Sequence, residues 1–352
     1  MSLFKADSIK SQLFITVVIP AKDEVLNIGL AIESILAQNY PNELFEIIVV
    51  NDHSTDDTAK VVENFVQNNV RLINLEDIPL KTGEVAFKKR AIEEAIKISK
   101  GEIIVTTDAD CQHHKNWLKT LSNAFDQKKA NIISGPVLFN FNNSLFQRFQ
   151  ALDFLGMIGI TAASIEVGMF NLANGANLAF RKAVFNEVGG YSGIDQQASG
   201  DDMLLIYKFS RVDASKVLFL KSKEAIVYTH PASNLNEFVQ QRLRWTSKSF
   251  GYQDHRITLI LAFVYLVNVL LLVSFIGGII FWKSSLVWSF VGQFAFMSIV
   301  DFLFLRKMAV FFDRKALLRV FFPSQFMHVI YIVVIGLLGN VIPYKWKGRK
   351  LN

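Results

Sequence analysis

The sequence has very little cysteine and little charge. Cys111 is the single cysteine among 352 residues, so no internal disulfide can form. This excludes a disulfide-stabilised scaffold and favours a reducing compartment for the soluble part. Charged residues make up 19% of the chain, whereas 51% of the residues are apolar. One soluble domain rarely has this balance, which therefore predicts two parts that face different solvents.

Several familiar sequence features are missing as well. The chain contains neither GxGxxG nor GxxxxGK[ST], which counts against a dinucleotide site and a P-loop. Residues 1–13, interpreted as an N-terminal tail, hold no long apolar run, so neither a signal peptide nor an N-terminal anchor is expected. We therefore expect the soluble part on the cytosolic side of a cell (plasma or inner) membrane that the chain crosses more than once.

Long apolar segments are concentrated after Arg256. At about 1.5 Å per residue, each is long enough to cross a bilayer as a helix. A membrane domain is predicted over residues 257–352, with about three segments: 257–282, 284–305 and 320–343. The one acid in these segments, Asp301, has two interpretations: a functional group, or a charge near a helix end that faces Arg306 or the protein interior.

Basic residues flank the apolar segments. The net charge is +6, and much of the excess lies in residues 306–319 and 345–350. This placement favours a membrane surface over nucleic acid as the partner of the basic residues. Three crossings put 306–319 in the cytosol, as basic loops prefer, but put 345–350 outside. A re-entrant third segment therefore stays open as an alternative.

Apolar runs typical of buried strands alternate with helical spacing in the first part of the chain. FITVVIP from Phe14, FEIIVV from Phe45 and EIIVTT from Glu102 are predicted strands, and helical periodicity lies between them. This order predicts an α/β domain with an open, mostly parallel sheet, whose ligand lies at the carboxyl ends of the strands. Acidic side chains follow all three strands: Asp23 and Glu24, Asp52, and Asp108 with Asp110.

The pair Asp108 and Asp110 carries a specific expectation. Two carboxylates one residue apart repel each other at a strand end, and a divalent cation removes that cost. We therefore predict Mg²⁺ or Mn²⁺ at Asp108 and Asp110, with a solvated turn or a helix N-cap as the alternative. His113, His114 and His230 are further possible ligands, for which surface or hydrogen-bonding roles are the alternative.

Seven sequence elements follow one another in a characteristic order. They are IPAKDE at 19–24, Asp52 in VVNDHSTDDT, Lys88 in KKRA, DAD at 108–110, ANGANLAFRK at 173–182, GDDMLL at 200–205 and QRLRW at 241–245. With this set the chain resembles the family 2 glycosyltransferases over about residues 14–250. It is most similar to their membrane-bound processive branch, which includes chitin, hyaluronan and poly-N-acetylglucosamine synthases. The resemblance implies a GT-A domain over 14–230, an amphipathic interface region over 231–256 and then the membrane helices.

The resemblance also implies roles for individual residues. Binding of a nucleotide-diphosphate sugar is implied for Ala21, Asp23, Glu24, Asp52, Lys88 and Asp108, and metal binding for Asp108 and Asp110. Asp202 matches the general base, and the alternative is that GDD only places two acids at a helix N-terminus. Acceptor or product binding is implied for Asn174, Gly175, Asp201, Gln241, Arg244 and Trp245.

The QRLRW residues fall on a predicted amphipathic helix. In it, Phe238, Leu243 and Trp245 interleave with polar residues such as Arg242. An interfacial anchor of basic and aromatic side chains is the alternative to acceptor binding by these residues, and both can hold at once.

These observations support one leading hypothesis and two alternatives. The leading hypothesis is a metal-dependent inverting hexosyltransferase that extends a β-linked polysaccharide at the cytosolic face. Transfer of one sugar to a polyprenyl phosphate or another lipid is the enzymatic alternative, and a non-catalytic membrane scaffold that retains a nucleotide-sugar-binding fold is the other. Because the membrane part is too short to form a large channel alone, a homo-oligomer or an export partner is also expected.

Overall fold

A computed structural model describes residues 4, 12–78, 86–142, 144–195, 197, 200–247, 254–339, 342–347 and 349–351. The chain forms two compact units, residues 1–138 with 161–230 and residues 139–160 with 231–352. The sequence-based prediction kept residues 139–160 in one continuous domain over 14–230. In the structure they belong to the second unit, where their side chains contact helices from the C-terminal part of the chain.

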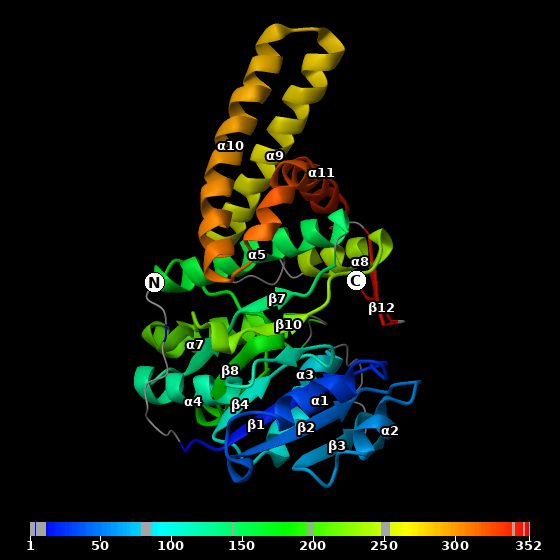
Figure 1. The fold of residues 1–352 in the computed structure, drawn as a ribbon, viewed down its shortest axis with the longest axis vertical. Helices are drawn as coiled ribbons and strands as arrows, with labels where there is room; N and C mark the ends of the chain where they lie inside the picture. Colours follow the sequence, from blue (N-terminus) through cyan, green and yellow to red (C-terminus); the bar gives the residue numbers. More distant parts are fainter. Residues whose placement is uncertain are drawn as a thin grey trace. The chain divides into compact units, whose positions relative to one another are not determined.

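The first unit is built on a seven-stranded sheet with the order β3-β2-β1-β4-β8-β6-β9 (Figure 1). Its strands are β1 (Ile15–Ala21), β2 (Phe45–Asn51), β3 (Val70–Asn74), β4 (Ile103–Thr106), β6 (Ile132–Ser134), β8 (Leu178–Arg181) and β9 (Val217–Phe219). β1 pairs in parallel with β2 and β4, and β2 with β3, whereas β8 is antiparallel to β4 and β6. The sheet is mostly parallel, which confirms the predicted fold class.

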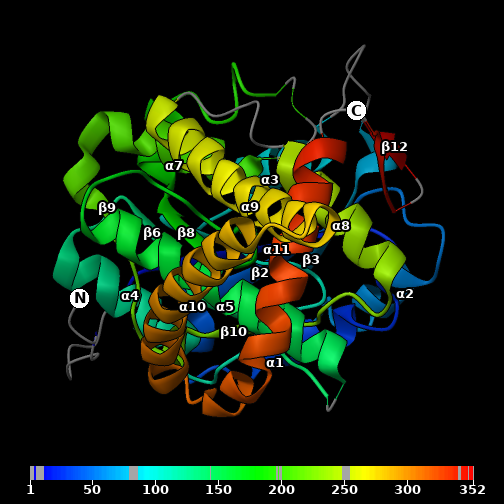
Figure 2. The same cartoon turned by 90° about the horizontal axis from the view of Figure 1, so that it is seen from above.

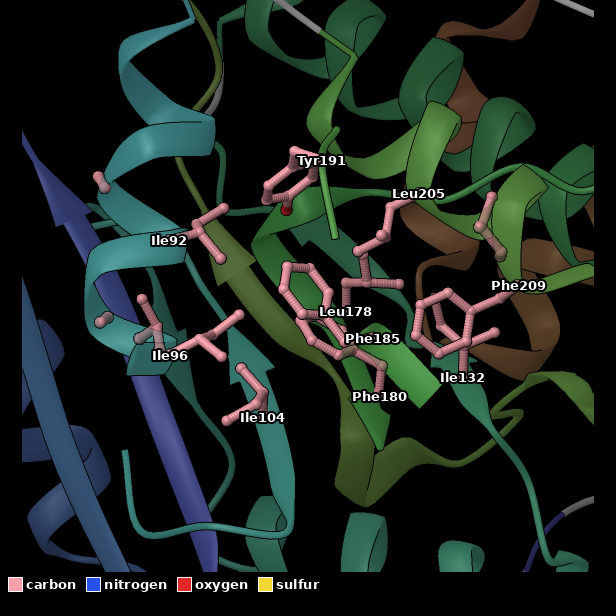
Figure 3. Close-up of a cluster of buried hydrophobic side chains, with 14 of the residues drawn as sticks. Ile92, Ile96, Ile104, Ile132, Leu178, Phe180, Phe185, Tyr191, Leu205 and Phe209 are labelled. Carbon is pink, nitrogen blue, oxygen red and sulfur yellow. The ribbon is translucent and has the colours of Figure 1, made fainter. Parts of the chain in front are cut away.

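Helices cover this sheet and bury its apolar runs. They are α1 (Ile28–Leu36), α2 (Thr58–Glu63), α3 (Phe87–Ile98), α4 (Trp117–Lys128), α6 (Lys182–Glu187) and α7 (Asp201–Asp213). Every residue of β2 is buried, as expected for a parallel strand with layers on both faces. Figure 3 shows one such layer, in which side chains of α3, α6 and α7 gather with Ile104, Leu178 and Phe180 of the sheet.

A smaller sheet adjoins the acidic turn at residues 108–110. It has the order β5-β10-β7 and consists of β5 (Gln112–His113), β10 (Val227–Thr229) and β7 (Val137–Phe139). The antiparallel pairing of β10 with β5 brings the end of β10 next to that turn.

The second unit is mainly helical. It contains α5 (Leu145–Glu166) up to residue 160, α8 (Leu235–Ser247), α9 (His255–Phe281), α10 (Ser284–Phe311), α11 (Phe321–Leu338) and the strands β11 (Tyr344–Trp346) and β12 (Arg349–Leu351). Among the described residues, three helical stretches are long and apolar enough to cross a membrane: His255–Phe281, Ser284–Phe311 and Lys315–Leu338. α9 and α10 run side by side, as Figures 1 and 2 both show.

The helices match the three predicted segments, and the largest differences are at two ends. The prediction ends this segment at residue 305 because the charge of Arg306 ends the apolar run. α10 itself continues to Phe311, because Arg and Lys still favour helix. α11 ends at Leu338 instead of residue 343, with Gly339 as its C-cap. The Asp301 carboxylate accepts a hydrogen bond of 2.9 Å from Gln325 Nε2 of α11, so it faces a neighbouring helix, as its second interpretation expected.

Candidate functional site

The carboxyl ends of β2, β1 and β4 form one edge of the large sheet, because these parallel strands are direct neighbours. Ala21 is the last residue of β1, and its carbonyl accepts a hydrogen bond of 2.8 Å from the backbone N–H of Asp52, which follows β2. Asp108 follows β4 by two residues. The predicted strand-end acids therefore share this edge, as the alternation of strands and helices predicted.

The loop after β1 is fastened to the loop after β2. Asp23 has a left-handed backbone with φ of 50°, and its Oδ1 accepts a hydrogen bond of 2.7 Å from the backbone N–H of Thr55. The backbone N–H of Glu24 donates to Thr58 Oγ1 at 2.8 Å. One carboxylate oxygen of Asp23 thus holds the loop in shape. A contact of Asp23 or Glu24 with a nucleotide stays a prediction.

Asp52 is buried beside two basic groups of the same loops. Its Oδ1 lies 2.9 Å from His53 Nδ1, and Lys22 Nζ donates to the carbonyl of His53 at 2.8 Å. The acid is therefore held at the strand end with a fixed orientation, which suits a group that accepts hydrogen bonds from a ligand.

Lys88 of α3 joins acids from distant parts of the sequence. Its Nζ lies 2.6 Å from Asp108 Oδ1 and 3.5 Å from Asp201 Oδ2. Burial by itself lowers the pKa of the Lys88 ammonium, but attraction by Asp108 and Asp201, together with the hydrogen bond to Asp108, outweighs it and holds this pKa well above its usual value. Lys88 therefore keeps its positive charge between the strand-end acids and α7.

Asp110 is a crowded carboxylate. Burial, followed by repulsion from Asp108 and Glu24, raises the pKa of Asp110, while a hydrogen bond of 2.9 Å from Thr229 Oγ1 opposes that rise. Thr229 comes from β10, and nothing in the local sequence around 108–110 indicated this partner. A cation beside Asp110 would favour its charged form, so its environment suits the predicted metal site.

The metal-binding prediction can be compared with the donor groups that the chain offers. Within the described part of the chain, no group of three or more His, Cys, Asp and Glu side chains is placed to hold a metal ion. Asp108 and Asp110 are thus the protein ligands that the prediction relies on, and other ligands would have to come from elsewhere, such as a diphosphate.

The predicted histidine ligands do not join these acids. His113 is buried, its Nδ1 lies 2.8 Å from Ser34 Oγ, and its Nε2 lies 2.9 Å from Thr107 Oγ1. Burial lowers the pKa of His113 to about 3, so the imidazole is neutral and both nitrogens are already hydrogen-bonded. His114 Nδ1 accepts a hydrogen bond of 3.2 Å from a backbone N–H, and His230 is exposed. The hydrogen-bonding and surface interpretations of these residues are therefore the better ones.

Asp201 and Asp202 are the first two residues of α7, so the helix N-terminus considered from the sequence is present. The preceding Gly200 has a φ of +81°, a conformation that favours glycine. Asp202 is buried, and its Oδ2 accepts a hydrogen bond of 3.1 Å from the backbone N–H of Gly175. The two acids therefore lie at the helix N-terminus and next to the turn at Asn174 and Gly175. The role of Asp202 as the general base stays a prediction.

Gly175 leaves room for charged side chains of the same site. A Cβ added at this position would lie 3.0 Å from Asp201 Oδ2 and 3.2 Å from Lys88 Nζ. The space left by the glycine is therefore occupied by the Lys88–Asp201 pair in this structure, and acceptor binding at Gly175 stays a prediction. Asn174 caps the same turn, because its side chain accepts a hydrogen bond of 3.0 Å from the backbone N–H of Ala176.

Adding one methyl group at this turn tests the arrangement. Gly175→Ala is expected to displace Lys88 and Asp201 and to lower kcat/KM about tenfold, because small misplacements of charged groups weaken catalysis strongly. The measurement is steady-state kinetics of sugar transfer by purified protein. Gly29→Ala is the matched control, since its added Cβ meets Val61 at an ordinary 3.5 Å. Full activity of Gly175→Ala would show that the close packing at this turn is dispensable.

Lys89, the neighbour of Lys88, has a structural role that the sequence analysis missed. Its side chain is buried, and Nζ donates to the carbonyls of Ile194 at 2.5 Å and Gln197 at 2.8 Å. Lys89 thus holds two carbonyls that precede Asp201 and Asp202 in the sequence. The KKRA run placed a lysine next to Lys88, but only the fold shows which carbonyls it reaches.

Gln241, Arg244 and Trp245 lie on α8, in the second unit. Trp245 is half-buried, and its ring centroid lies 5.8 Å from that of Phe154 in α5. Arg242, which we had placed among the polar residues of this helix, is buried instead, with its guanidinium carbon 4.3 Å from the Trp245 ring centroid. The reason is a buried acid, Asp153 of α5, which lies 2.9 Å from Arg242. Acceptor binding by this helix stays a prediction.

Two family models match long stretches of this chain. One, described as glycosyl transferase family 2, matches residues 16–189, and the other, described as glycosyl transferase family group 2, matches residues 103–338. Together they cover the sheet, the acidic turn, α7, α8 and the three candidate membrane helices.

Individual relatives have low sequence identity but long alignments. Glycosyltransferase AglE of Haloferax volcanii is 24% identical over 235 residues, which cover 66% of this chain and 71% of AglE. Poly-β-1,6-N-acetyl-D-glucosamine synthase of Staphylococcus epidermidis is 23% identical, covering 61% and 49%, and β-monoglucosyldiacylglycerol synthase of Nostoc is 22% identical, covering 69% and 50%. The match thus spans about half the length of these two synthases.

Among solved structures, the chain is similar to the mannosyltransferase PcManGT of Pyrobaculum calidifontis, which was determined in complex with GDP-Man and Mn²⁺. The TM-score is 0.56 at 15% identity, and the alignment covers 94% of this chain and 87% of that one. This likeness supports the same fold in both proteins.

Proposed function

Because the chain belongs to glycosyl transferase family 2 and is a GT-A glycosyltransferase with three candidate membrane helices, we propose that it extends a β-linked polysaccharide from a nucleotide-diphosphate sugar at the cytosolic face of a cell membrane. The reaction is proposed to invert the configuration at the anomeric carbon. Donor sugars of this class occur in a solved relative, which binds GDP-Man, and a polymer-forming relative is a poly-β-1,6-N-acetyl-D-glucosamine synthase.

One observation supports this proposal most directly. The Lys88 ammonium lies between Asp108 at a strand end and Asp201 at the start of α7, next to Asp202 and Gly175. A cation in this position can attract the diphosphate of a donor, while Asp202 is close enough to serve the acceptor hydroxyl. The residues that we propose for leaving-group stabilisation and for proton removal are therefore close together in one unit.

In the proposed mechanism, Asp202 removes the proton from the acceptor hydroxyl as that oxygen attacks the anomeric carbon. Asp201 is a weaker candidate for this step, since it is paired with Lys88. Ala21, Asp23, Glu24 and Asp52 are proposed to line the nucleoside pocket at the carboxyl ends of β1 and β2. When bound at Asp108 and Asp110, Mg²⁺ or Mn²⁺ would neutralise charge on the leaving diphosphate.

Gln241, Arg244 and Trp245 are proposed to hold the acceptor, with Trp245 stacking on a sugar ring. The three candidate membrane helices among the described residues are few for a polysaccharide channel, so we propose that a second copy of the chain or an export partner completes the path. The membrane contact is proposed to be shared by these helices and by the basic residues that flank them.

A second candidate function is transfer of a single sugar to a lipid. It is favoured by the relative named β-monoglucosyldiacylglycerol synthase, which is as similar to this chain as the polysaccharide synthase is. Donor screening in membranes that contain the protein, followed by digestion of the product with linkage-specific hydrolases, tests both candidates. A polymer supports the first function, and one sugar on an extractable lipid supports the second.

Trp245→Ala tests the acceptor contact. Stacking and burial of an indole against a sugar are worth about 1 to 3 kcal/mol, so its loss is expected to shorten the product or stop elongation while donor binding is kept. The measurement is product sizing on gels at matched protein levels. Trp282→Ala is the control, because Trp282 is 92% exposed at the turn between α9 and α10. Unchanged product length in Trp245→Ala would favour the role of an interfacial anchor for Trp245.

A further inference from the structure

A buried charged cluster lies in the second unit, on three different helices. The Asp153 carboxylate of α5 lies 2.9 Å from Arg242 Nη2 of α8, and the two side chains are 5% and 3% exposed. His328 Nδ1 and Tyr331 OH of α11 donate to Asp153 Oδ1 at 3.0 Å and 2.9 Å. We call these four residues, Asp153, Arg242, His328 and Tyr331, the Asp153 cluster.

Burial normally disfavours a charged carboxylate, but the basic and hydrogen-bonding groups around Asp153 compensate for this cost. Burial alone would raise the pKa of Asp153, but attraction by Arg242 and the hydrogen bond from His328 outweigh it and hold this pKa below its usual value. The acid is therefore ionised. A buried, ionised pair that loses one partner leaves an uncompensated charge, so each member fixes the position of the other.

Aromatic rings enclose the guanidinium of Arg242. Its central carbon lies 4.3 Å from the ring centroid of Trp245, 4.8 Å from that of Phe238 and 5.5 Å from that of Tyr331. A guanidinium over an aromatic face is attracted to it and limits the orientations that the ring can adopt. Phe238, Arg242 and Trp245 follow helical spacing, so they line one face of α8.

From this geometry we propose that the Asp153 cluster is a positioning device for Trp245. Asp153 orients Arg242, Arg242 covers one face of the indole, and His328 and Tyr331 tie this arrangement to a helix that is long and apolar enough to cross a membrane. The inference rests on the proposed function in one respect, namely that Trp245 contacts the acceptor. None of the four residues then needs to touch the sugar.

Asp153→Asn tests this proposal, because it keeps the size of the side chain and removes its charge. We expect acceptor-dependent kcat to fall about 10- to 100-fold and the product to shorten, with donor Kd unchanged within about twofold, since misplacement of a substrate-contacting group acts at this scale. Asp301→Asn is the matched control: Asp301 is also an acid of the second unit hydrogen-bonded to α11, through Gln325, but it has no place in the cluster.

A double-mutant cycle separates positioning from general support of the fold. In the Trp245→Ala background, Asp153→Asn is expected to have no further effect on product length, because the ring that it positions is absent. Additive effects of the two substitutions, or full activity of Asp153→Asn, would overturn the proposal.

Two further measurements cover the remaining outcomes. If Asp153→Asn is not recovered in membranes, Tyr331→Phe replaces it as the test. This substitution removes one hydrogen bond to Asp153 and keeps the aromatic ring. Acceptor-dependent kcat is expected to fall, by less than tenfold. The tryptophan emission attributable to Trp245, obtained by subtracting the spectrum of Trp245→Phe, is expected to shift in the Asp153 variant even where no acceptor is known. A wild-type protein that transfers no sugar would contradict the proposed function, whereas an unshifted Trp245 spectrum would contradict the positioning role alone.

Discussion

Asp202→Asn is expected to lower kcat about 10²- to 10⁴-fold while donor Kd stays nearly constant. Asparagine keeps the shape of the side chain and an oxygen that can accept the backbone N–H of Gly175, which Asp202 Oδ2 binds at 3.1 Å. It cannot accept the proton of an attacking hydroxyl. The loss should therefore appear in the chemical step, measured by single-turnover transfer with saturating donor.

Asp201→Asn is the matched comparison, since the two acids are adjacent at the start of α7. Asp201 lies 3.5 Å from Lys88, so its loss is expected to alter donor affinity more than the chemical step. The opposite pattern is equally informative. If Asp202→Asn raises donor Kd strongly and keeps kcat, Asp202 belongs to the nucleotide site and Asp201 becomes the candidate base.

Removal of divalent cations is expected to abolish turnover. Asp108 and Asp110 are crowded, and repulsion within this turn contributes to the raised pKa of Asp110. Neutralisation of a leaving diphosphate requires positive charge, of which Lys88 supplies only one unit. Release of nucleoside diphosphate should stop in excess EDTA and return when Mg²⁺ or Mn²⁺ is added in excess over the chelator.

Asp110→Asn provides the protein-side counterpart of chelation. It removes one carboxylate of the pair but can still accept the hydrogen bond from Thr229, so the turn is expected to keep its shape. The metal concentration required for half-maximal activity should rise. Full activity in excess EDTA would remove the metal assignment of Asp108 and Asp110, whatever the variant shows.

The strands, the acidic strand ends and the membrane segments could be predicted from local pattern. β1, β2 and β4 are continuous apolar runs, and such runs are stable only when layers cover both faces of a parallel sheet. Parallel neighbours end at the same edge, so Asp52 and Asp108 had to lie on one side. The candidate spans followed from length and hydropathy, because a bilayer core has a nearly constant thickness.

Pairings between distant residues could not be predicted in this way. Local periodicity shows which face a residue occupies, but not which element packs against that face. Lys88 reaches Asp201 only because α3 and the start of α7 meet beside Gly175. Thr229 reaches Asp110 only because β10 pairs with β5.

Arg242 illustrates the same limit most clearly. Its spacing from Phe238 and Trp245 places it on their face of α8, where a charge is costly without a partner, whereas the sequence analysis counts it among the polar residues of the helix. The partner, Asp153, lies on α5, far away in the sequence. The sequence alone thus determined the fold class, the acidic sheet edge and the candidate membrane helices, since these depend on short-range pattern and solvent. Only the tertiary structure decided which charges are buried together, because the free energy of a buried charge depends on partners brought to it by the fold.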